Sequence, residues 1–170
     1  LFLYWNAHGW DSLNKQLRKN GDLIKIDLPG RKMARNKKSY YTLIGGDAIE
    51  AINNWLQYRP DTVIVDGIEV PNPFIFVDQS KTQFTKSGLR RYWLRHLRKL
   101  GLISLEKGEQ HRSRTGKNLH ELRDVYRTQW TKSNAKSEVG EYFIGHTIDA
   151  LGYDKSFRDV EFYQNEYKKA

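Results

Sequence analysis

The chain has 170 residues, of which 38% are hydrophobic and 13% aromatic, a composition that suits one globular domain with a single core. It has no cysteine, which excludes disulfides, thiolate metal sites and cysteine nucleophiles, and no apolar run long enough to cross a bilayer, so we expect a soluble protein without membrane contact. The 29 Lys and Arg against 20 Asp and Glu give a net charge of +9, which either serves solubility alone or attracts a polyanion such as nucleic acid.

The first half of the chain predicts two helices and a β-hairpin. Apolar residues recur at helical spacing in residues 11–21 and 46–59, which predicts an amphipathic helix in each. Between them, "DLIKIDL" alternates apolar and charged residues and "SYYTLI" is rich in β-forming residues. The intervening "PGRKMARNKK" supplies turn residues and positive charge, so we expect a hairpin with a strongly basic tip. Residues 62–78 predict short extended pieces around turns.

The second half predicts helices. Residues 87–103 carry apolar residues at helical spacing and basic residues over the rest of the circumference, which indicates a basic amphipathic helix. Residues 118–130 predict a helix whose inward residues are Leu122, Val125 and Tyr126, and two further helices are expected from "SEVGEYFIGH" onwards. The expected fold is therefore α+β and mainly α, with one small antiparallel β-sheet on an edge.

A histidine and an arginine stand three positions apart in "NLHELRDVYRTQW". On a helix, His120 and Arg123 share a face, and Arg127 lies near them. An imidazole gives one directional hydrogen bond or a proton, and a guanidinium fits two phosphate oxygens, so the pair suits a phosphodiester; Zn²⁺ is disfavoured because the guanidinium would repel it. The plain alternative is a surface helix with solvated charges. Further on, "YFIGHTID" supplies a second imidazole, His146, after Gly145, where the backbone can approach another group closely.

These segments together resemble a known family. "HELRDVYRTQW" resembles the HxLRHxxAT segment of the tyrosine recombinases, also called the phage integrase family, and "FIGHTID" resembles their LGH segment. In that family a hairpin lysine comes first, followed by HxxR, the GH histidine and a nucleophilic tyrosine. The basic tip stands where the lysine belongs, with Lys32 the first choice and Lys37 or Lys38 as alternatives, and "KSGLRRYWLRHLRKLGLI" resembles the helix ahead of HxxR. The resemblance spans the hairpin to the C-terminus.

The resemblance implies cleavage and rejoining of DNA strands without metal or cofactor. A tyrosine hydroxyl attacks the scissile phosphate, forms a 3′-phosphotyrosyl bond and frees a 5′-hydroxyl. Arg123 would stabilise charge on the phosphate, and His120 and His146 would hydrogen-bond its oxygens or handle the proton of the nucleophile. The hairpin lysine would protonate the leaving oxygen.

Two features depart from the family pattern. A further family arginine, in an RxxE segment, would fall near residues 1–8, which contain no arginine, so that segment lies upstream or the site has diverged; a fragment without it would be inactive. The family spacing after the GH histidine reaches Lys155 rather than a tyrosine. Tyr153 is the closest tyrosine and our first choice as nucleophile, followed by Tyr167 and Tyr163, although each could equally be a core residue.

The resemblance also implies partners and surroundings. We expect residues 1–170 to be a catalytic domain preceded by a DNA-clamping domain, acting on double-stranded DNA as a homo-tetramer in the cytoplasm or host nucleoid, as part of a mobile genetic element. The basic residues expected to contact DNA are Arg31, Arg35, Lys37, Lys38, Arg90, Arg91, Arg95 and Arg127. The competing hypothesis is a non-catalytic basic DNA-binding domain whose helix 87–103 contacts phosphates. An RNA-binding domain would need exposed aromatic residues on a sheet, which only "SYYTLI" offers.

Overall fold

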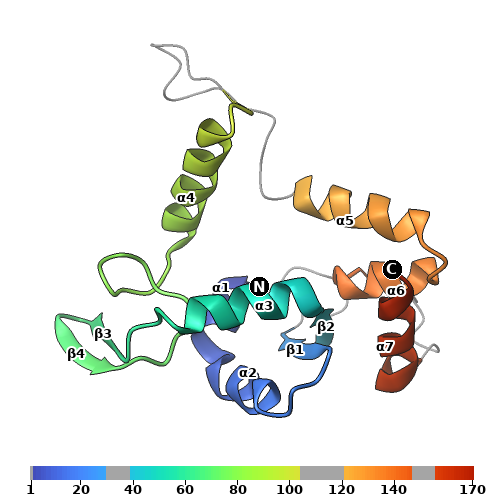
Figure 1. Ribbon diagram of the computed structural model, residues 1–170, viewed down its shortest axis with the longest axis horizontal. Helices are drawn as coiled ribbons and strands as arrows, with labels where there is room; N and C mark the ends of the chain where they lie inside the picture. The colour runs from blue at the N-terminus through green and yellow to red at the C-terminus, as the bar shows by residue number, and fades with distance from the viewer. Residues whose placement is uncertain (1, 30–38, 104–120, 147–155) are drawn as a thin grey trace.

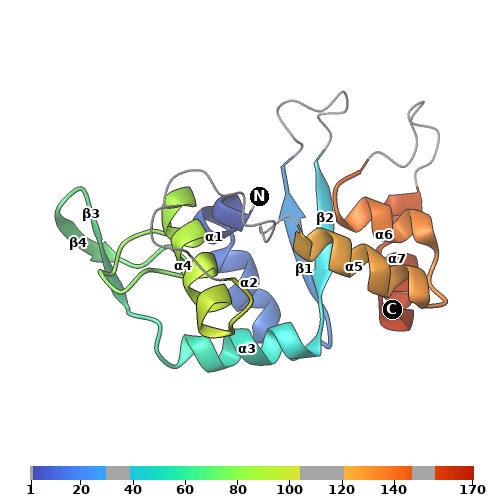
Figure 2. The ribbon, with the colours of Figure 1, turned by 90° about the horizontal axis from the view of Figure 1, so that it is seen from above.

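A β-hairpin lies at the centre of the computed structural model, which describes residues 2–29, 39–103, 121–146 and 156–170 (Figure 1). Strands β1 (Ile24–Leu28) and β2 (Tyr40–Ile44) pair antiparallel, with Ile24 opposite Ile44. The predicted hairpin is thus confirmed, whereas its basic tip falls outside the described residues. Side chains alternate between the two faces of a strand, so the buried apolar residues of β1 face one side of the hairpin and those of β2 face the other. Helices cover both faces (Figure 2).

On one side of the hairpin, helices α1 (Phe2–His8) and α2 (Trp10–Leu17) pack against β1, and α3 (Gly46–Leu56) continues from β2. Their shared core consists of Leu13, Ile24, Ile52 and Ile75. The predicted helices at 11–21 and 46–59 are confirmed, whereas the sequence analysis left α1 unassigned. A fully buried amide fixes α1: the Asn6 side chain donates to the carbonyl of Phe76 at 2.9 Å and accepts from its N–H at 2.6 Å.

On the other side, helices α5 (Glu121–Lys132), α6 (Ser137–Phe143) and α7 (Val160–Lys169) form a second layer, with the short 3₁₀ helix η1 (Ser156–Arg158) before α7. Helix α6 packs against β2, and α5 and α7 both pack against α6. Aromatic rings dominate this core, and edge-to-face contacts between such rings add to the stabilisation from buried area. Its buried residues are Tyr41, Leu43, Trp130, Val139, Tyr142, Phe143 and Tyr163.

The fold is mixed α+β and mainly helical, as expected, but the described residues contain two small sheets rather than one. The second sheet is the hairpin of β3 (Thr62–Val65) and β4 (Ile68–Pro71), where only extended pieces were expected. Asp66 and Gly67 connect the strands with positive φ angles of 52° and 80°, which is the backbone of a type I′ turn. An Asp-Gly pair favours this turn because both central residues need positive φ.

Helix α4 (Lys86–Lys99) confirms the predicted basic helix and projects from the rest of the described chain (Figure 1). Its N-cap is Thr85, whose hydroxyl accepts the N–H of Gly88 at 3.0 Å. At about 100° per residue, the arginines and the last lysine of α4 fall within about half of the helix circumference, whereas Lys86 lies outside this half. The basic residues of this exposed half are Arg90, Arg91, Arg95, Arg98 and Lys99. None of the described helices combines the length and apolar character needed to cross a bilayer.

The inward face predicted for α5 is only partly correct. Tyr126 and Trp130 pack into the aromatic core, but Leu122 and Val125 are 50% and 57% exposed. The physical reason is helix geometry: Tyr126 and Trp130, four residues apart, define the buried face of α5, and at about 100° per residue Leu122 lies about 80° and Val125 about 140° away from Trp130.

The contact between α5 and α6 depends on the missing side chain of Gly140. A Cβ atom at this position would lie 2.7 Å from Cδ1 and Nε1 of Trp130, whose ring is buried and donates to the carbonyl of Lys136. We expect Gly140→Ala to lower the free energy of unfolding by about 1–3 kcal/mol, because the ring cannot retreat and α6 must shift. Gly46→Ala, in the first turn of α3 with no atom within 4 Å, is the matched control and should be neutral or slightly stabilising. Urea unfolding of both variants tests this, and equal stabilities would contradict it.

A buried carboxylate attaches α7 to the start of α6. Glu166 accepts the N–H of Lys136 at 2.7 Å and pairs with Lys169. The hydrogen bond from Lys169 and then that from Lys136 lower the pKa of Glu166 below its ordinary value, against the effect of burial. A folded-state pKa below the unfolded one stabilises the fold above the unfolded pKa, and this stabilisation is lost as the pH falls through the folded pKa.

We therefore expect Glu166→Gln to be less stable than the wild type by about 1–3 kcal/mol at pH 7. The difference should shrink as the pH falls below the ordinary glutamate pKa of about 4.3 and through the lower pKa of Glu166 in the folded protein. Urea unfolding across this pH range measures the difference, with Glu138→Gln, an exposed residue of α6, as the control without effect. A difference that stays constant with pH would show that the ionised carboxylate is not the stabilising group.

Candidate functional site

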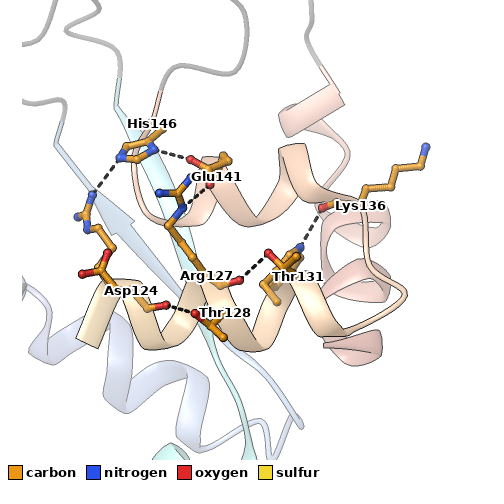
Figure 3. Close-up of polar contacts among 9 residues, drawn as sticks. Asp124, Arg127, Thr128, Thr131, Lys136, Glu141 and His146 are labelled. Atoms are coloured by element: carbon orange, nitrogen blue, oxygen red, sulfur yellow. Dashed lines mark hydrogen bonds and ion pairs between the residues drawn. The ribbon is translucent and has the colours of Figure 1, made fainter. Parts of the chain in front are cut away.

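Two predicted site residues, Arg123 and His146, meet at the rim of the aromatic core. Arg123 lies in the first turn of α5, and His146 follows the end of α6. They are 23 residues apart in the sequence, yet Nη1 of Arg123 lies 3.4 Å from Nε2 of His146. The packing of α5 against α6 brings the two side chains together, one at the start of α5 and the other just after α6 (Figure 3).

The end of α6 fixes the backbone of His146. The N–H of Gly145 donates to the carbonyl of Tyr142 at 2.8 Å, and the N–H of His146 donates to the carbonyl of Glu141 at 3.0 Å. This pair of bonds is the Schellman arrangement, in which the residue after the helix takes the left-handed conformation. Gly145 has φ +76°, a backbone conformation that residues other than glycine rarely adopt.

Gly145 also allows the close approach predicted from the sequence. A Cβ atom there would lie 2.7 Å from both Cζ and the hydroxyl of Tyr40 on β2. The chain therefore turns against the hairpin directly before His146, so both the backbone conformation and the packing require glycine.

A carboxylate that the sequence analysis did not single out links the polar groups of the site. Oε2 of Glu141 lies 2.5 Å from Nδ1 of His146, and Oε1 accepts from Nε of Arg127 at 2.7 Å (Figure 3). Burial would raise the pKa of Glu141, but the hydrogen bonds and charges of His146 and Arg127 outweigh it and lower the pKa. The carboxylate is therefore ionised near neutral pH and balances part of the positive charge around it.

The cluster of Arg123, Arg127, Glu141 and His146 is open to solvent. The side chains of His146, Glu141 and Arg127 are 39%, 31% and 52% exposed. An approaching ligand can therefore reach the imidazole and the guanidinium groups. A guanidinium binds anionic oxygens, and an imidazole supported by a carboxylate can exchange a proton with a bound group, so the arrangement suits a reaction at an oxyanion.

The remaining predicted residues fall into three groups. His120, Tyr153 and the basic residues of the hairpin tip lie outside the described residues; the tip residues are Arg31, Lys32, Arg35, Lys37 and Lys38. The three predicted DNA-contacting arginines of α4 are exposed, namely Arg90, Arg91 and Arg95. Arg127 was expected to contact DNA, and its Nε is bound to Glu141.

The two alternative nucleophiles belong to the aromatic core. Tyr163 is 1% exposed, and its hydroxyl lies 3.3 Å from Oγ of Ser156. Tyr167 is half-buried, with its ring centroid 5.8 Å from that of Phe143, and burial raises its pKa. The Tyr167 hydroxyl lies near Gly45, directly after β2, whereas the turn before His146 lies against Tyr40 at the other end of that strand.

Glu141 carried a weak signal in the sequence. A glutamate five residues before a histidine, with a glycine directly before that histidine, is the spacing at which a Schellman turn returns the histidine to the glutamate. Within the described residues, no group of three or more His, Cys, Asp or Glu side chains could hold a metal ion.

Comparison of the chain with family models, with curated proteins and with solved structures finds no match in any of the three. The geometry of the site and the sequence resemblance are therefore the two observations on which a functional proposal rests.

Proposed function

We propose that this chain is the catalytic part of an enzyme that cuts and rejoins DNA strands through a tyrosine–phosphate bond, in the manner of the tyrosine recombinases. The observation that carries the proposal is the meeting of Arg123 and His146 at 3.4 Å. The resemblance assigned these two residues to separate motifs, HxxR and GH, on sequence alone. The two motifs are separate in the sequence, and their side chains need to meet only if both belong to one site. The contact between Arg123 and His146 therefore supports assigning both motifs to one catalytic site.

The proposed chemistry uses each group according to its type. The tyrosine oxygen forms a bond to phosphorus while the bond from phosphorus to the 5′-oxygen breaks. The tyrosine proton passes to a base, and the leaving oxygen takes a proton from an acid, for which Lys32 is the first choice. Arg123 stabilises the charge on the phosphate in the transition state, and His146 acts at the reacting groups with His120.

The nucleophile in this proposal is Tyr153. The burial of Tyr163 in the core and the packing of Tyr167 against Phe143 count against both alternatives. Tyr153 also follows the GH histidine most closely of the three in the sequence.

The basic half of α4 supports DNA as the substrate. Its arginines are exposed and lie on one half of the helix, so several can contact phosphates of one duplex at the same time. The same observation favours the second candidate function, a DNA-binding domain without catalysis, because binding of DNA by α4 does not require a reaction at His146. The two candidates differ in one respect, since only the enzyme forms a covalent bond to DNA.

We expect the full-length protein, incubated with nicked duplexes, to form an SDS-resistant adduct that peptide mass spectrometry maps to Tyr153. Tyr153→Phe should abolish the adduct, because phenylalanine has no nucleophilic oxygen. Arg123→Ala should slow its formation by about 10²–10³-fold, the usual effect of removing one group that stabilises an oxyanion.

Tyr163→Phe serves as the matched control and should still form the adduct, because the Tyr163 hydroxyl is buried. An adduct that persists in Tyr153→Phe would move the nucleophile to another residue. Salt-sensitive DNA binding by the wild type with no adduct on any duplex would favour the non-catalytic domain.

Replacing Arg90, Arg91 and Arg95 together by alanine should weaken binding to duplex DNA and make it less sensitive to salt. Each lost phosphate contact should reduce the slope of log K against log salt by about 0.9. Fluorescence anisotropy of a labelled duplex at several salt concentrations measures this slope. The control replaces three exposed basic residues of the α2 region with the same change in charge, namely Lys15, Arg18 and Lys19. Equal losses in both variants would show that net charge, rather than the face of α4, governs binding.

A further inference from the structure

We infer that Glu141 is a positioning residue of this site, which holds the neutral imidazole of His146 as the Nδ1–H tautomer and so presents an unprotonated Nε2 towards Arg123. The tautomer itself follows from the contacts alone, whereas the role in catalysis rests on the proposed function. The sequence resemblance assigned no role to this carboxylate.

The tautomer of His146 follows from which hydrogen bonds Arg123 and Glu141 can donate or accept. A guanidinium has donors and no acceptor, so the contact between Arg123 and Nε2 of His146 is a hydrogen bond only when Nε2 accepts. A neutral imidazole carries one N–H, which must then be on Nδ1. Nδ1 lies 2.5 Å from Oε2 of Glu141, an ionised oxygen that can only accept. Both contacts thus require the same tautomer.

Glu141 holds His146 at two points. Its backbone carbonyl accepts the N–H of His146, and its carboxylate faces Nδ1 of the ring. The backbone hydrogen bond fixes the position of the His146 backbone, and the contact with the carboxylate fixes the orientation of the imidazole ring. The turn between Glu141 and His146 requires a positive φ angle at position 145, which glycine adopts with little strain. The arrangement therefore depends on the order of Glu141, Gly145 and His146 in the sequence.

Arg127 keeps the carboxylate in place. Its Nε donates to Oε1 of Glu141 while Oε2 serves the imidazole, so each oxygen has its own partner (Figure 3). These partners lower the pKa of Glu141, which favours the ionised form that can only accept. In this interpretation Arg127 acts through Glu141, in addition to any contact that its remaining N–H groups make with DNA.

The consequence for the reaction is a direction of proton transfer. In the proposed reaction the Arg123 guanidinium turns from Nε2 to the phosphate oxygens, and the lone pair of Nε2 that this frees accepts the proton of the tyrosine hydroxyl as the bond from oxygen to phosphorus forms. The carboxylate of Glu141 then stabilises the resulting imidazolium through Nδ1–H. The bond from phosphorus to the 5′-oxygen breaks, and the leaving oxygen takes its proton from the separate acid.

The tautomer is measurable without DNA. Nitrogen-15 NMR of the histidine-labelled full chain, recorded at alkaline pH where imidazoles are neutral, distinguishes a protonated from an unprotonated ring nitrogen. His146→Gln identifies the signals of His146. We expect Nδ1 to be protonated in the wild type and a fraction of the Nε2–H tautomer to appear in Glu141→Ala, where only the contact with Arg123 still favours Nδ1–H. Glu138→Ala, which removes a carboxylate of the same helix whose hydrogen bond is to Ser137, should leave the tautomer unchanged. A protonated Nε2 in the wild type, or an unchanged tautomer in Glu141→Ala, would overturn the inference.

A second readout tests the role in catalysis. Glu141→Gln should slow formation of the covalent adduct, by at most the roughly 10²–10⁴-fold that one proton-transferring group contributes, while DNA affinity stays within about twofold, because the carboxylate acts on His146 rather than on the phosphate. Glu138→Gln should leave the rate unchanged. Equal rates in wild type and Glu141→Gln would overturn the positioning role. If the wild type forms no adduct, the proposed function fails by itself, and the tautomer measurement still decides whether Glu141 orients His146.

Discussion

The contact of the Trp130 ring with the bare backbone of Gly140 sets the separation of α5 and α6, and the second layer of the fold depends on it. Four residues of the seven-residue α6 are buried, because the helix packs between the hairpin, α5 and α7. Such a short helix is not stable alone, so its position comes from packing rather than from helix propensity. Glu141 projects from this helix, and His146 follows its end, so the geometry of the site is set by the aromatic core beneath it.

The sequence predicted most helices and the central hairpin because their apolar residues follow the periods of 3.6 and 2. Prediction from the sequence failed for elements whose structure does not depend on the spacing of apolar residues. The β3–β4 hairpin was indicated by Asp66-Gly67, a pair that specifies a turn type rather than a strand. The exposure of Leu122 and Val125 depends on which face of α5 packs into the aromatic core, and tertiary packing selects the face of Tyr126 and Trp130 rather than that of Leu122 and Val125. Helix α1 depends on a buried amide, Asn6, which pairs with a backbone 70 residues away.

The candidate site shows the same division. Arg123 and His146 could be found because each belongs to a motif with a characteristic residue order. Their contact could not be found, because it requires the packing of α5 on α6. Glu141 has a spacing to Gly145 and His146 that makes sense only once the turn after α6 is known. Sequence order thus identified groups with chemical function, while the group that orients one of them emerged from the fold.

The ion pairs of the polar cluster contribute little to the stability of the fold, and this bears on the purpose of the cluster. Ion pairs between side chains as exposed as those of Arg127 and Glu141 contribute about 0–1 kcal/mol to stability. Burying one aromatic side chain of the core beneath contributes about 1.5–3 kcal/mol, so the core stabilises the packing of α5 on α6 more than the cluster does. A guanidinium, an imidazole and a shared carboxylate arranged at the solvent side of such a core therefore gain little for the fold. We propose that the arrangement serves a ligand that meets both Arg123 and His146, as a phosphodiester would in the proposed reaction.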